Sequence, residues 1–233
     1  MLLDLNADLG EGAGFDADLM PLITSANICC GAHAGSADET AATLALARRH
    51  GVAVGAHPGY PDRANFGRTP VAAPSNTLYA QVVHQLAGFV AAAQRAGVAV
   101  RYVKPHGAMY NQAAADPAFA NVICSAVAGW ALPVLGLPGS HMEATCATLG
   151  LPFVPEGFAD RRYRPDGSLV PRTEPDAFVH DPAEAVDQIE RLVRDRGVKS
   201  VCVHGDSPGA VAFTAAVRDG LLARGFTLRA FAV

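Results

Sequence analysis

The sequence has few charged side chains and no run of basic ones. Asp, Glu, Lys and Arg make up 17% of the 233 residues, whereas typical soluble domains have about 25%. The 18 basic and 22 acidic residues give a net charge of −4. Without a basic patch, nucleic acid is a poor candidate partner. The low charge instead suggests a compact fold with a surface partly covered by other subunits, and a homo-oligomer is one such arrangement.

Long apolar runs and paired cysteine motifs are also missing. No stretch of about 18 uninterrupted apolar residues is present, so the sequence predicts no membrane span. The N-terminus reaches a carboxylate at Asp4 and has no basic segment before it, so no signal peptide is expected and the predicted location is cytoplasmic. The five cysteines include no CxxC, which argues against a disulfide framework or a structural zinc site. We expect most of them, including Cys29 and Cys30, to lie in the core.

Two nucleotide-binding signatures are absent as well, since the chain has neither GxGxxG after its first apolar run nor GxxxxGK[ST]. What it does have is an alternation of short apolar runs and helix-like stretches. The expected strands are residues 2–6, 23–29, 52–57, 100–106, 133–137, 153–158, 200–204 and 227–232. The expected helices are residues 36–50, 76–96, 116–128, 140–149, 182–196 and 210–224.

The boundaries of these segments favour parallel strands joined by helices. Ser36 and Glu39 form a capping box at one helix start. A glycine follows five of the helix-like stretches, where a left-handed residue is wanted, and leads directly into an apolar run. These are Gly51, Gly97, Gly150, Gly197 and Gly225. Either a closed barrel or an open doubly wound sheet fits this pattern.

Polar residues follow many different strands, and this favours the barrel, in which every strand end faces one site. We therefore predict one α/β domain over residues 1–233, an irregular βα barrel. An irregular loop or lid is expected at about 158–181, because that segment has several prolines, no clear period and more length than an ordinary βα loop. The polar residues at the strand ends are Asn6, Asp8, Glu11, His33, His57, Lys104, His106, Asp160, Arg161, His204 and Asp206.

Four histidines at four strand ends are the strongest sign of chemistry. Together with Asp8, we expect His57, His106 and Lys104 to be catalytic. Asp8 is suited to act as a general base or a metal ligand, although a loop-capping role is the alternative. Lys104 would neutralise a substrate anion or form a plain salt bridge. The other four histidines, at positions 50, 84, 141 and 180, are interpreted as surface residues.

The remaining candidates would bind substrate, and a metal is left open. Arg68 and Arg161 could hold an anion with two hydrogen bonds, or could simply be solvated. Carboxylate and imidazole groups from separate strands suit a divalent metal, although no local metal motif such as HExxH is present. If a metal binds, the first candidate ligands are Asp8, His33 and His57. A catalytic role for Cys29 or Cys30 is the weaker interpretation.

Seven motifs, in order, resemble the LamB/YcsF family. They are LNADLGEG, SANICCGAHAG, GAHPGYPD, FGR, YVKPHGAMYN, EGFADRRY and CVHGDSP, and the match runs from residue 3 to about residue 208. The resemblance implies a seven-stranded irregular βα barrel related to glycoside hydrolases and deacetylases. It implies a role as the A subunit of bacterial 5-oxoprolinase, which opens 5-oxo-L-proline to L-glutamate with hydrolysis of ATP to ADP and phosphate. It also implies partner subunits B and C, on which the ATP could be handled.

Two other functions stay open at this point. A metal-dependent amide or carbohydrate deacetylase on the same barrel would use the same Asp and His residues, would bind a metal and would not need ATP. A non-catalytic subunit that only binds a small acid is the other alternative. The crowded polar strand ends argue against it, because a scaffold does not need them.

Overall fold

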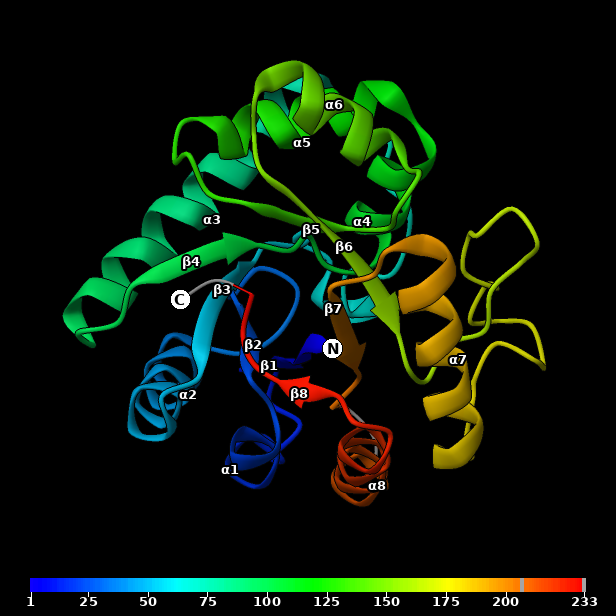
Figure 1. The fold of residues 1–233 in the computed structure, drawn as a ribbon. Helices are drawn as coiled ribbons and strands as arrows, with labels where there is room; N and C mark the ends of the chain where they lie inside the picture. The colour runs from blue at the N-terminus through cyan, green and yellow to red at the C-terminus, as the bar shows by residue number, and fades with distance from the viewer. Residues whose placement is uncertain (206–207, 232–233) are drawn as a thin grey trace.

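The computed structural model describes residues 1–205 and 208–231, and these residues form a closed parallel barrel surrounded by helices (Figure 1). The barrel strands are β1 (Leu2–Leu9), β2 (Ser25–Cys29), β3 (Ala53–His57), β4 (Val100–Val103), β5 (Val134–Gly136), β6 (Phe153–Phe158) and β7 (Ser200–Val203). Each strand pairs in parallel with the next, and β7 pairs with β1 to close the ring. The predicted seven-stranded single-domain barrel is therefore confirmed.

The ring is irregular between β3 and β5. The register shifts between Val54 and Gly55, and β4 pairs with β5 at one position only, Val103 with Val134. The eighth predicted strand is reduced to β8 (Thr227–Leu228). It pairs with the amino-terminal end of β1 and takes no part in closing the barrel. Loose pairing on one side is what makes this barrel distorted.

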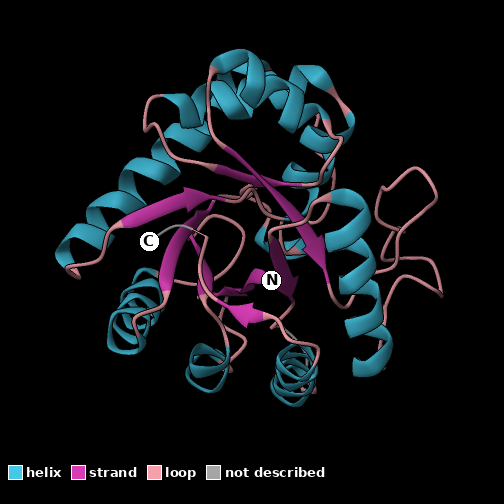
Figure 2. Cartoon of the chain, in the orientation of Figure 1, coloured by secondary structure: helices cyan, strands magenta, loops and turns pink. Residues whose placement is uncertain are grey.

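Helices cover the outside of the barrel on all sides in Figure 2. They are α1 (Asp16–Leu19), α2 (Ala37–His50), α3 (Ser75–Arg95), α4 (Gly107–Ala115), α5 (Pro117–Ala128), α6 (His141–Leu149), α7 (Pro182–Arg196) and α8 (Ala210–Ala223), with short 3₁₀ turns η1 (Met20–Leu22) and η2 (Arg63–Asn65). None of the helices in the described part of the chain is both long enough and apolar enough to cross a membrane.

All six predicted helices are confirmed, to within a residue or so at each end. Ser36 accepts a hydrogen bond from the N–H of Glu39 at 3.1 Å, as the capping box requires. All five glycines predicted to end helices have positive φ. The sequence did not predict α1 or α4. Strand β4 is shorter than the predicted 100–106, because Pro105 has no N–H with which to continue the ladder.

The two faces of β1 explain why this barrel has a polar interior. Leu3, Leu5 and Leu9 are buried in the hydrophobic core under the helices. Asp4, Asn6 and Asp8 alternate with them, so they point to the opposite face of the strand, into the barrel. Barrel interiors are more often filled with Val, Ile and Leu. Here the alternation places a column of buried polar groups along the barrel axis.

Segment 158–181, between β6 and α7, is an irregular excursion at the edge of the barrel (Figure 1). Two isolated antiparallel bridges hold it together, Arg161 with Phe178 and Tyr163 with Leu169. It has no helix and no extended strand after Phe158. Its position at the end of β6 brings several of its side chains to the site described next.

Candidate active site

The polar strand ends meet at the carboxyl end of the barrel. Because the seven strands are parallel, their carboxyl ends open on one face. β1 carries Asp8 one residue before its end and leads to Glu11, and β3 ends with His57. Lys104 and His106 follow β4, and His204 follows β7. Apart from His204, which is half-buried, the side chains of Asp8, His57, Lys104 and His106 are buried, and that of Glu11 is nearly so.

Lys104 is the centre of the first cluster of side chains. Its ammonium lies 2.9 Å from Asp8 Oδ1 and 2.9 Å from Glu156 Oε1. It also contacts Cys202 Sγ at 3.0 Å and lies over the Phe158 ring at 5.1 Å. The lysine is 2% exposed. The ion pairs therefore lie almost entirely out of water, where charges interact strongly.

Amide side chains fix the orientation of these carboxylates. Asn27 donates to Asp8 Oδ1 at 2.7 Å and to Asn6 Oδ1 at 2.6 Å. Asn6 in turn donates to Glu156 Oε1 at 3.2 Å, and Tyr102 donates to Asn27 at 2.7 Å. With Lys104 and, at 3.8 Å, Cys202 as the other donors, Asp8 Oδ1 accepts three hydrogen bonds. Asp8 Oδ2 lies 3.4 Å from His57 Nε2 and is the oxygen left to face other groups.

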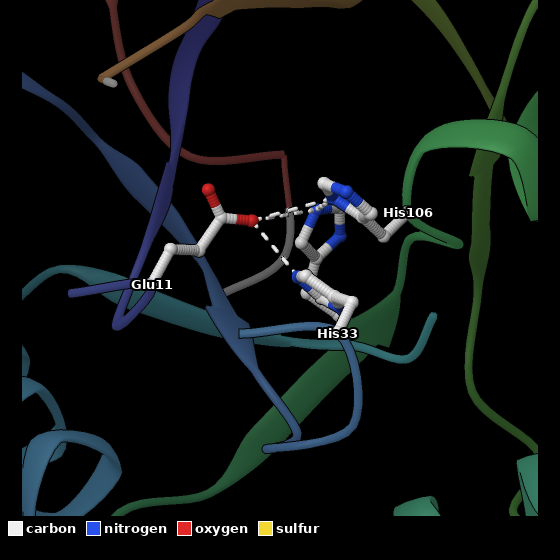
Figure 3. Close-up of side chains that lie close together, drawn as sticks. Glu11, His33 and His106 are labelled. Atoms are coloured by element: carbon white, nitrogen blue, oxygen red, sulfur yellow. Dashed lines mark hydrogen bonds and ion pairs between the residues drawn. The ribbon is translucent and has the colours of Figure 1, made fainter. Parts of the chain in front are cut away.

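Glu11 and three histidines form the second cluster, which we call the histidine cluster (Figure 3). Glu11 Oε1 lies 3.0 Å from His33 Nε2, 3.3 Å from His106 Nδ1 and 3.8 Å from His57 Nε2. The rings of His33 and His106 stack with centroids 3.7 Å apart. The histidine cluster consists of Glu11, His33, His57 and His106, and adjoins Asp8 through His57.

Burial and neighbouring charges perturb the pKa values of both clusters. Burial alone would raise the pKa of Asp8, but the charges of His57 and Lys104 outweigh it and hold that pKa well below its usual range. Burial raises the pKa of Glu156, although Lys104 opposes the shift. Burial also lowers the pKa of His33 to about 4. Asp8 is therefore ionised at neutral pH, and groups perturbed in this way are typical of functional sites.

A small cavity lies over the Lys104 cluster. Its volume is about 40 Å³, and it is lined by Asp8, His57, Lys104, His106, His204 and Tyr110 together with residues of segment 158–181. Three arginines also reach it, Arg68, Arg161 and Arg172. A larger groove of about 810 Å³ lies between α2 and α3, but its lining of alanines and arginines has none of the buried carboxylates or histidines. We therefore place the candidate active site at the smaller cavity.

Most of the residues predicted from the sequence converge here, and a few do not reach the cavity. Asn6 is saturated by hydrogen bonds inside the barrel. Arg161 does line the cavity, although it is 4% exposed and donates to the carbonyls of Ala177 and Val170. Asp160 holds His204 Nδ1 at 2.8 Å. Asp206 lies outside the described residues. The four histidines interpreted as surface residues are all exposed, and they are His50, His84, His141 and His180.

The sequence interpretation missed several groups that the structure brings to the site. Glu156 was not assigned to the site, yet it lies within β6 and faces Lys104. Asn27 and Cys202 were not assigned to the site, and Tyr110 belongs to the unpredicted helix α4. Polar residues alternating with apolar ones in β1, β2 and β7 were the available signal. Arg172 had no signal, because it reaches the cavity only through the fold of segment 158–181.

Similarity to known proteins agrees with this architecture. The family model described as the LamB/YcsF family matches residues 3–233. The chain belongs to this family. It is 47% identical to the A subunit of 5-oxoprolinase from Neisseria meningitidis serogroup C, over 98% of this chain and 99% of that protein.

Solved structures show the same fold. The crystal structure of a lactam utilization protein from Thermus thermophilus matches with a TM-score of 0.91 and 38% identity, covering 99% of this chain and all (100%) of that one. The catalytic domain of a peptidoglycan N-acetylglucosamine deacetylase from Eubacterium rectale matches with a TM-score of 0.56 at 12% identity, covering 100% of this chain and 89% of that one. At 12% identity, the match to the deacetylase shows only that the two proteins share the barrel fold.

Proposed function

We propose that this chain is the A subunit of an ATP-dependent 5-oxoprolinase and carries the site at which the lactam ring of 5-oxo-L-proline is opened. The observation that carries the proposal is the 47% identity, over nearly the whole of both chains, to a protein named as that subunit. The LamB/YcsF match and the name of the Thermus thermophilus relative agree with it. The buried carboxylate–lysine site supports hydrolysis of an amide.

The chemistry needs activation because a lactam carbonyl is a poor electrophile. Transfer of the γ-phosphoryl group of ATP to the lactam oxygen releases ADP and gives an O-phosphorylated ring. Water then adds to the ring carbon, and the C–N bond breaks as the nitrogen gains a proton, leaving an acyl phosphate. A second water releases phosphate and L-glutamate. The atoms balance as 5-oxoproline, ATP and two waters giving glutamate, ADP and phosphate.

Asp8 is the residue we assign to the attacking water. Its Oδ1 is occupied by Asn27 and Lys104, so Oδ2 is the oxygen that can accept the proton. Lys104 holds positive charge beside the position where the oxyanion would develop. His57 is the member of the histidine cluster that contacts Asp8, since its Nε2 lies 3.4 Å from Asp8 Oδ2. We assign it the role of positioning that carboxylate. His106 belongs to the same cluster.

The arginines around the cavity are suited to the anionic parts of the substrate. Arg68, Arg161 and Arg172 line the cavity together with His204. A substrate carboxylate and a transferred phosphoryl group both favour guanidinium partners. Asn6, whose hydrogen bonds all lie inside the barrel, positions Asn27 and Glu156 in this proposal and does not contact the substrate.

Segment 158–181 acts as a lid in this proposal. The cavity of about 40 Å³ is far below the roughly 300–1,000 Å³ of typical ligand pockets, so the site has to open to admit a substrate. Phe158, Arg161, Leu169 and Arg172 of this segment form one side of the cavity. Outward movement of the segment would enlarge the cavity without disturbing the barrel strands.

Other subunits complete the proposed enzyme. The relatives are named as one lettered component of 5-oxoprolinase, which implies an assembly, and we assign B and C subunits to it. Since the sequence has no phosphate-binding glycine motif, we place ATP chiefly on those partners.

Reconstitution tests the proposal. Glutamate release from 5-oxoproline and ATP is measured for this chain alone, for the B and C subunits alone and for the full mixture. We expect turnover only in the full mixture, and a loss of at least about 100-fold with Asp8→Asn, in the range typical of general-base removal. The exposed His84→Ala variant is the control and should retain full turnover. Full turnover by Asp8→Asn would remove Asp8 from the mechanism.

The histidine cluster favours one second function, a metal-dependent deacetylase acting on amides or carbohydrates. Imidazole and carboxylate ligands are typical of metal hydrolases. That enzyme would act without ATP and without other subunits. Turnover of an acetylated amide by this chain alone, combined with no glutamate release in any mixture, would support it over the oxoprolinase.

The cavity arginines give a separate prediction for the oxoprolinase. Arg172→Ala removes one guanidinium from the cavity wall and leaves the barrel strands intact. A hydrogen bond to a charged group is worth about 1.5–3 kcal/mol. We expect KM for 5-oxoproline to rise by roughly 10- to 100-fold with a much smaller change in kcat. An unchanged KM would mean that Arg172 does not contact the substrate.

A further inference from the structure

The histidine cluster contains hydrogen-bond acceptors that face one another. His57 Nδ1 lies 2.7 Å from the carbonyl oxygen of Lys104, and His106 Nε2 lies 2.8 Å from that of Phe66. A carbonyl oxygen can only accept, so each of these nitrogens carries the hydrogen. In the neutral rings, the other nitrogens, His57 Nε2 and His106 Nδ1, then present lone pairs.

These two lone pairs point at the same place. His57 Nε2 and His106 Nδ1 are 2.9 Å apart, and Glu11 Oε1 lies 3.8 Å and 3.3 Å from them. Two neutral imidazole acceptors and a carboxylate repel one another unless a cation lies between them. The backbone carbonyls set this orientation of the rings, and histidine ligands of metals are commonly oriented by such a hydrogen bond from their other nitrogen.

The spacing of the atoms matches that of a metal site. Metal–nitrogen bonds of about 2.0–2.1 Å in tetrahedral geometry place neighbouring ligand atoms about 3.3 Å apart. The distances among the donor atoms of Glu11, His57 and His106 run from 2.9 Å for His57–His106 to 3.8 Å for His57–Glu11. His33 stacks on His106 with ring planes only 5° apart, so the in-plane lone pairs of these two rings cannot point at one ion. Its Nε2 instead lies 3.0 Å from Glu11 Oε1 and orients that carboxylate (Figure 3). Three donors from three different strand ends therefore lie close enough together to share one ion.

The surrounding backbone is shaped to hold these rings. A Cβ atom at Gly59 would lie 2.4 Å from His33 Nδ1, and one at Gly67 would lie 2.8 Å from His33 Cβ and 3.1 Å from the His106 ring. Both positions therefore need glycine for the backbone to approach the imidazoles. His33, His57 and His106 are all buried, so the rings are held in place by packing.

Lys104 does not serve as the cation for this cluster. Its ammonium pairs with Asp8 and Glu156, and its other polar contacts are Asn6 and Cys202. Asp8, Cys202 and His204 are a second group of possible metal ligands. The Lys104 ammonium lies 2.9 Å from Asp8 Oδ1 and 3.0 Å from Cys202 Sγ, so that group already has a positive charge beside it. Glu11 instead faces histidines, whose hydrogen bonds hold its pKa below the usual range.

We propose that Glu11, His57 and His106 bind one divalent transition-metal ion such as Zn²⁺, and that His33 holds the Glu11 carboxylate in place. Neither Asp8 nor His33 is a ligand in this assignment, unlike in the trio considered from the sequence. Three protein ligands would leave a fourth position, at which a bound ion would hold and acidify a water. Asp8 Oδ2 lies beside the cluster, 3.4 Å from His57 Nε2, and would accept the proton of that water. That catalytic part rests on the proposed function, whereas binding of the metal does not.

Metal binding is tested on the full chain alone, with no substrate, ATP or other protein. The chain is treated with a chelator, then titrated with Zn²⁺ by calorimetry and with Co²⁺ by visible absorption, and the metal content is measured by mass spectrometry. We expect about one ion per chain and the d–d absorption of a tetrahedral Co²⁺ site.

The variants locate the ion. Glu11→Gln keeps the side-chain shape and removes the charge, and His57→Ala removes one nitrogen. Each should weaken Zn²⁺ binding by roughly 100-fold or more, beyond the 10- to 100-fold effect of changing a residue that only orients a ligand. His84→Ala, on the exposed face of α3, is the matched control and should bind as the wild type does. Glu11→Gln keeps the test valid if His57→Ala fails to fold.

Three outcomes would overturn the proposal. They are no stoichiometric binding by the wild type, unchanged binding by Glu11→Gln, and loss of binding in the His84→Ala control. The first would mean that a shared proton balances the cluster, and the last would mean surface histidine binding. An inactive reconstituted oxoprolinase with intact metal binding would instead count against the proposed function alone.

Discussion

Replacing Lys104 by methionine is the most informative perturbation of the barrel interior. Methionine is similar in length and fits an apolar space, but it leaves Asp8 and Glu156 without their counter-ion. Lys104 is 2% exposed and Glu156 is 0% exposed, so water cannot replace the lost ammonium. The carboxylates then have to remain charged in a poorly solvated place or take up protons.

The expected loss of stability is large at neutral pH. Removing one partner of a buried ion pair costs about 3–5 kcal/mol, a large part of the roughly 5–15 kcal/mol by which domains are stable. With a urea m-value of about 2 kcal/mol per M, the midpoint of unfolding should fall by roughly 1.5–2.5 M. The variant should still fold, because the rest of the core is untouched.

The loss should shrink at low pH. In the wild type the pKa of Asp8 lies below its unfolded value, so its stabilising effect is present above the unfolded pKa and is lost as pH falls through the folded pKa. Without Lys104, the pKa of Asp8 is less strongly lowered and that of Glu156 is raised further. Groups with raised folded pKa values destabilise the protein as pH rises. The difference in free energy of unfolding between the wild type and the Lys104→Met variant should therefore be larger at pH 7.5 than at pH 5.

Urea unfolding at both pH values, followed by circular dichroism, measures this effect. The double variant Asp8→Asn with Lys104→Met should cost less than the sum of the two single changes, with a coupling energy on the order of 1–3 kcal/mol. A loss below about 1 kcal/mol for Lys104→Met at pH 7.5, or the same loss at both pH values, would refute the reasoning that this lysine balances buried carboxylates.

Two further predictions concern stability. Burial raises the pKa of Asp4 to about 6, so its ionisation destabilises the folded protein as pH rises from about 4 to 6. At about 1.36 kcal/mol per unit, the wild type should lose on the order of 3 kcal/mol relative to Asp4→Asn between pH 4 and 7, and parallel pH profiles in urea titrations would contradict this. Gly59→Ala, which places a methyl group 2.4 Å from His33 Nδ1, should cost about 1–3 kcal/mol in thermal unfolding. Gly129→Ala has nothing within 4 Å and should change stability by less than about 0.5 kcal/mol, so equal effects would argue against a rigid His33.

The order of elements and the general location of the site could be predicted because both depend on local patterns. Helix ends are marked by Ser36 and by the glycines that adopt positive φ, and these signals act within a few residues. The strand-end positions of Asp8 and His57 follow from the parallel topology. Boundaries were less well predicted where a local rule competes with packing. Helix α4 begins directly after His106 without a side-chain cap, so no local start signal marks it.

The sequence by itself determined the alternation of helices and strands, the polar and apolar faces of β1 and the set of residues able to do chemistry, because these depend on side-chain type and spacing along the chain. Only the tertiary structure decided how those residues are divided. It paired Lys104 with Asp8 and Glu156, and it placed Glu11 among three histidines. Partners 96 and 150 residues apart in sequence are chosen by barrel closure, strand register and the path of the loops. No local pattern encodes those distances, because they result from the packing of the whole chain.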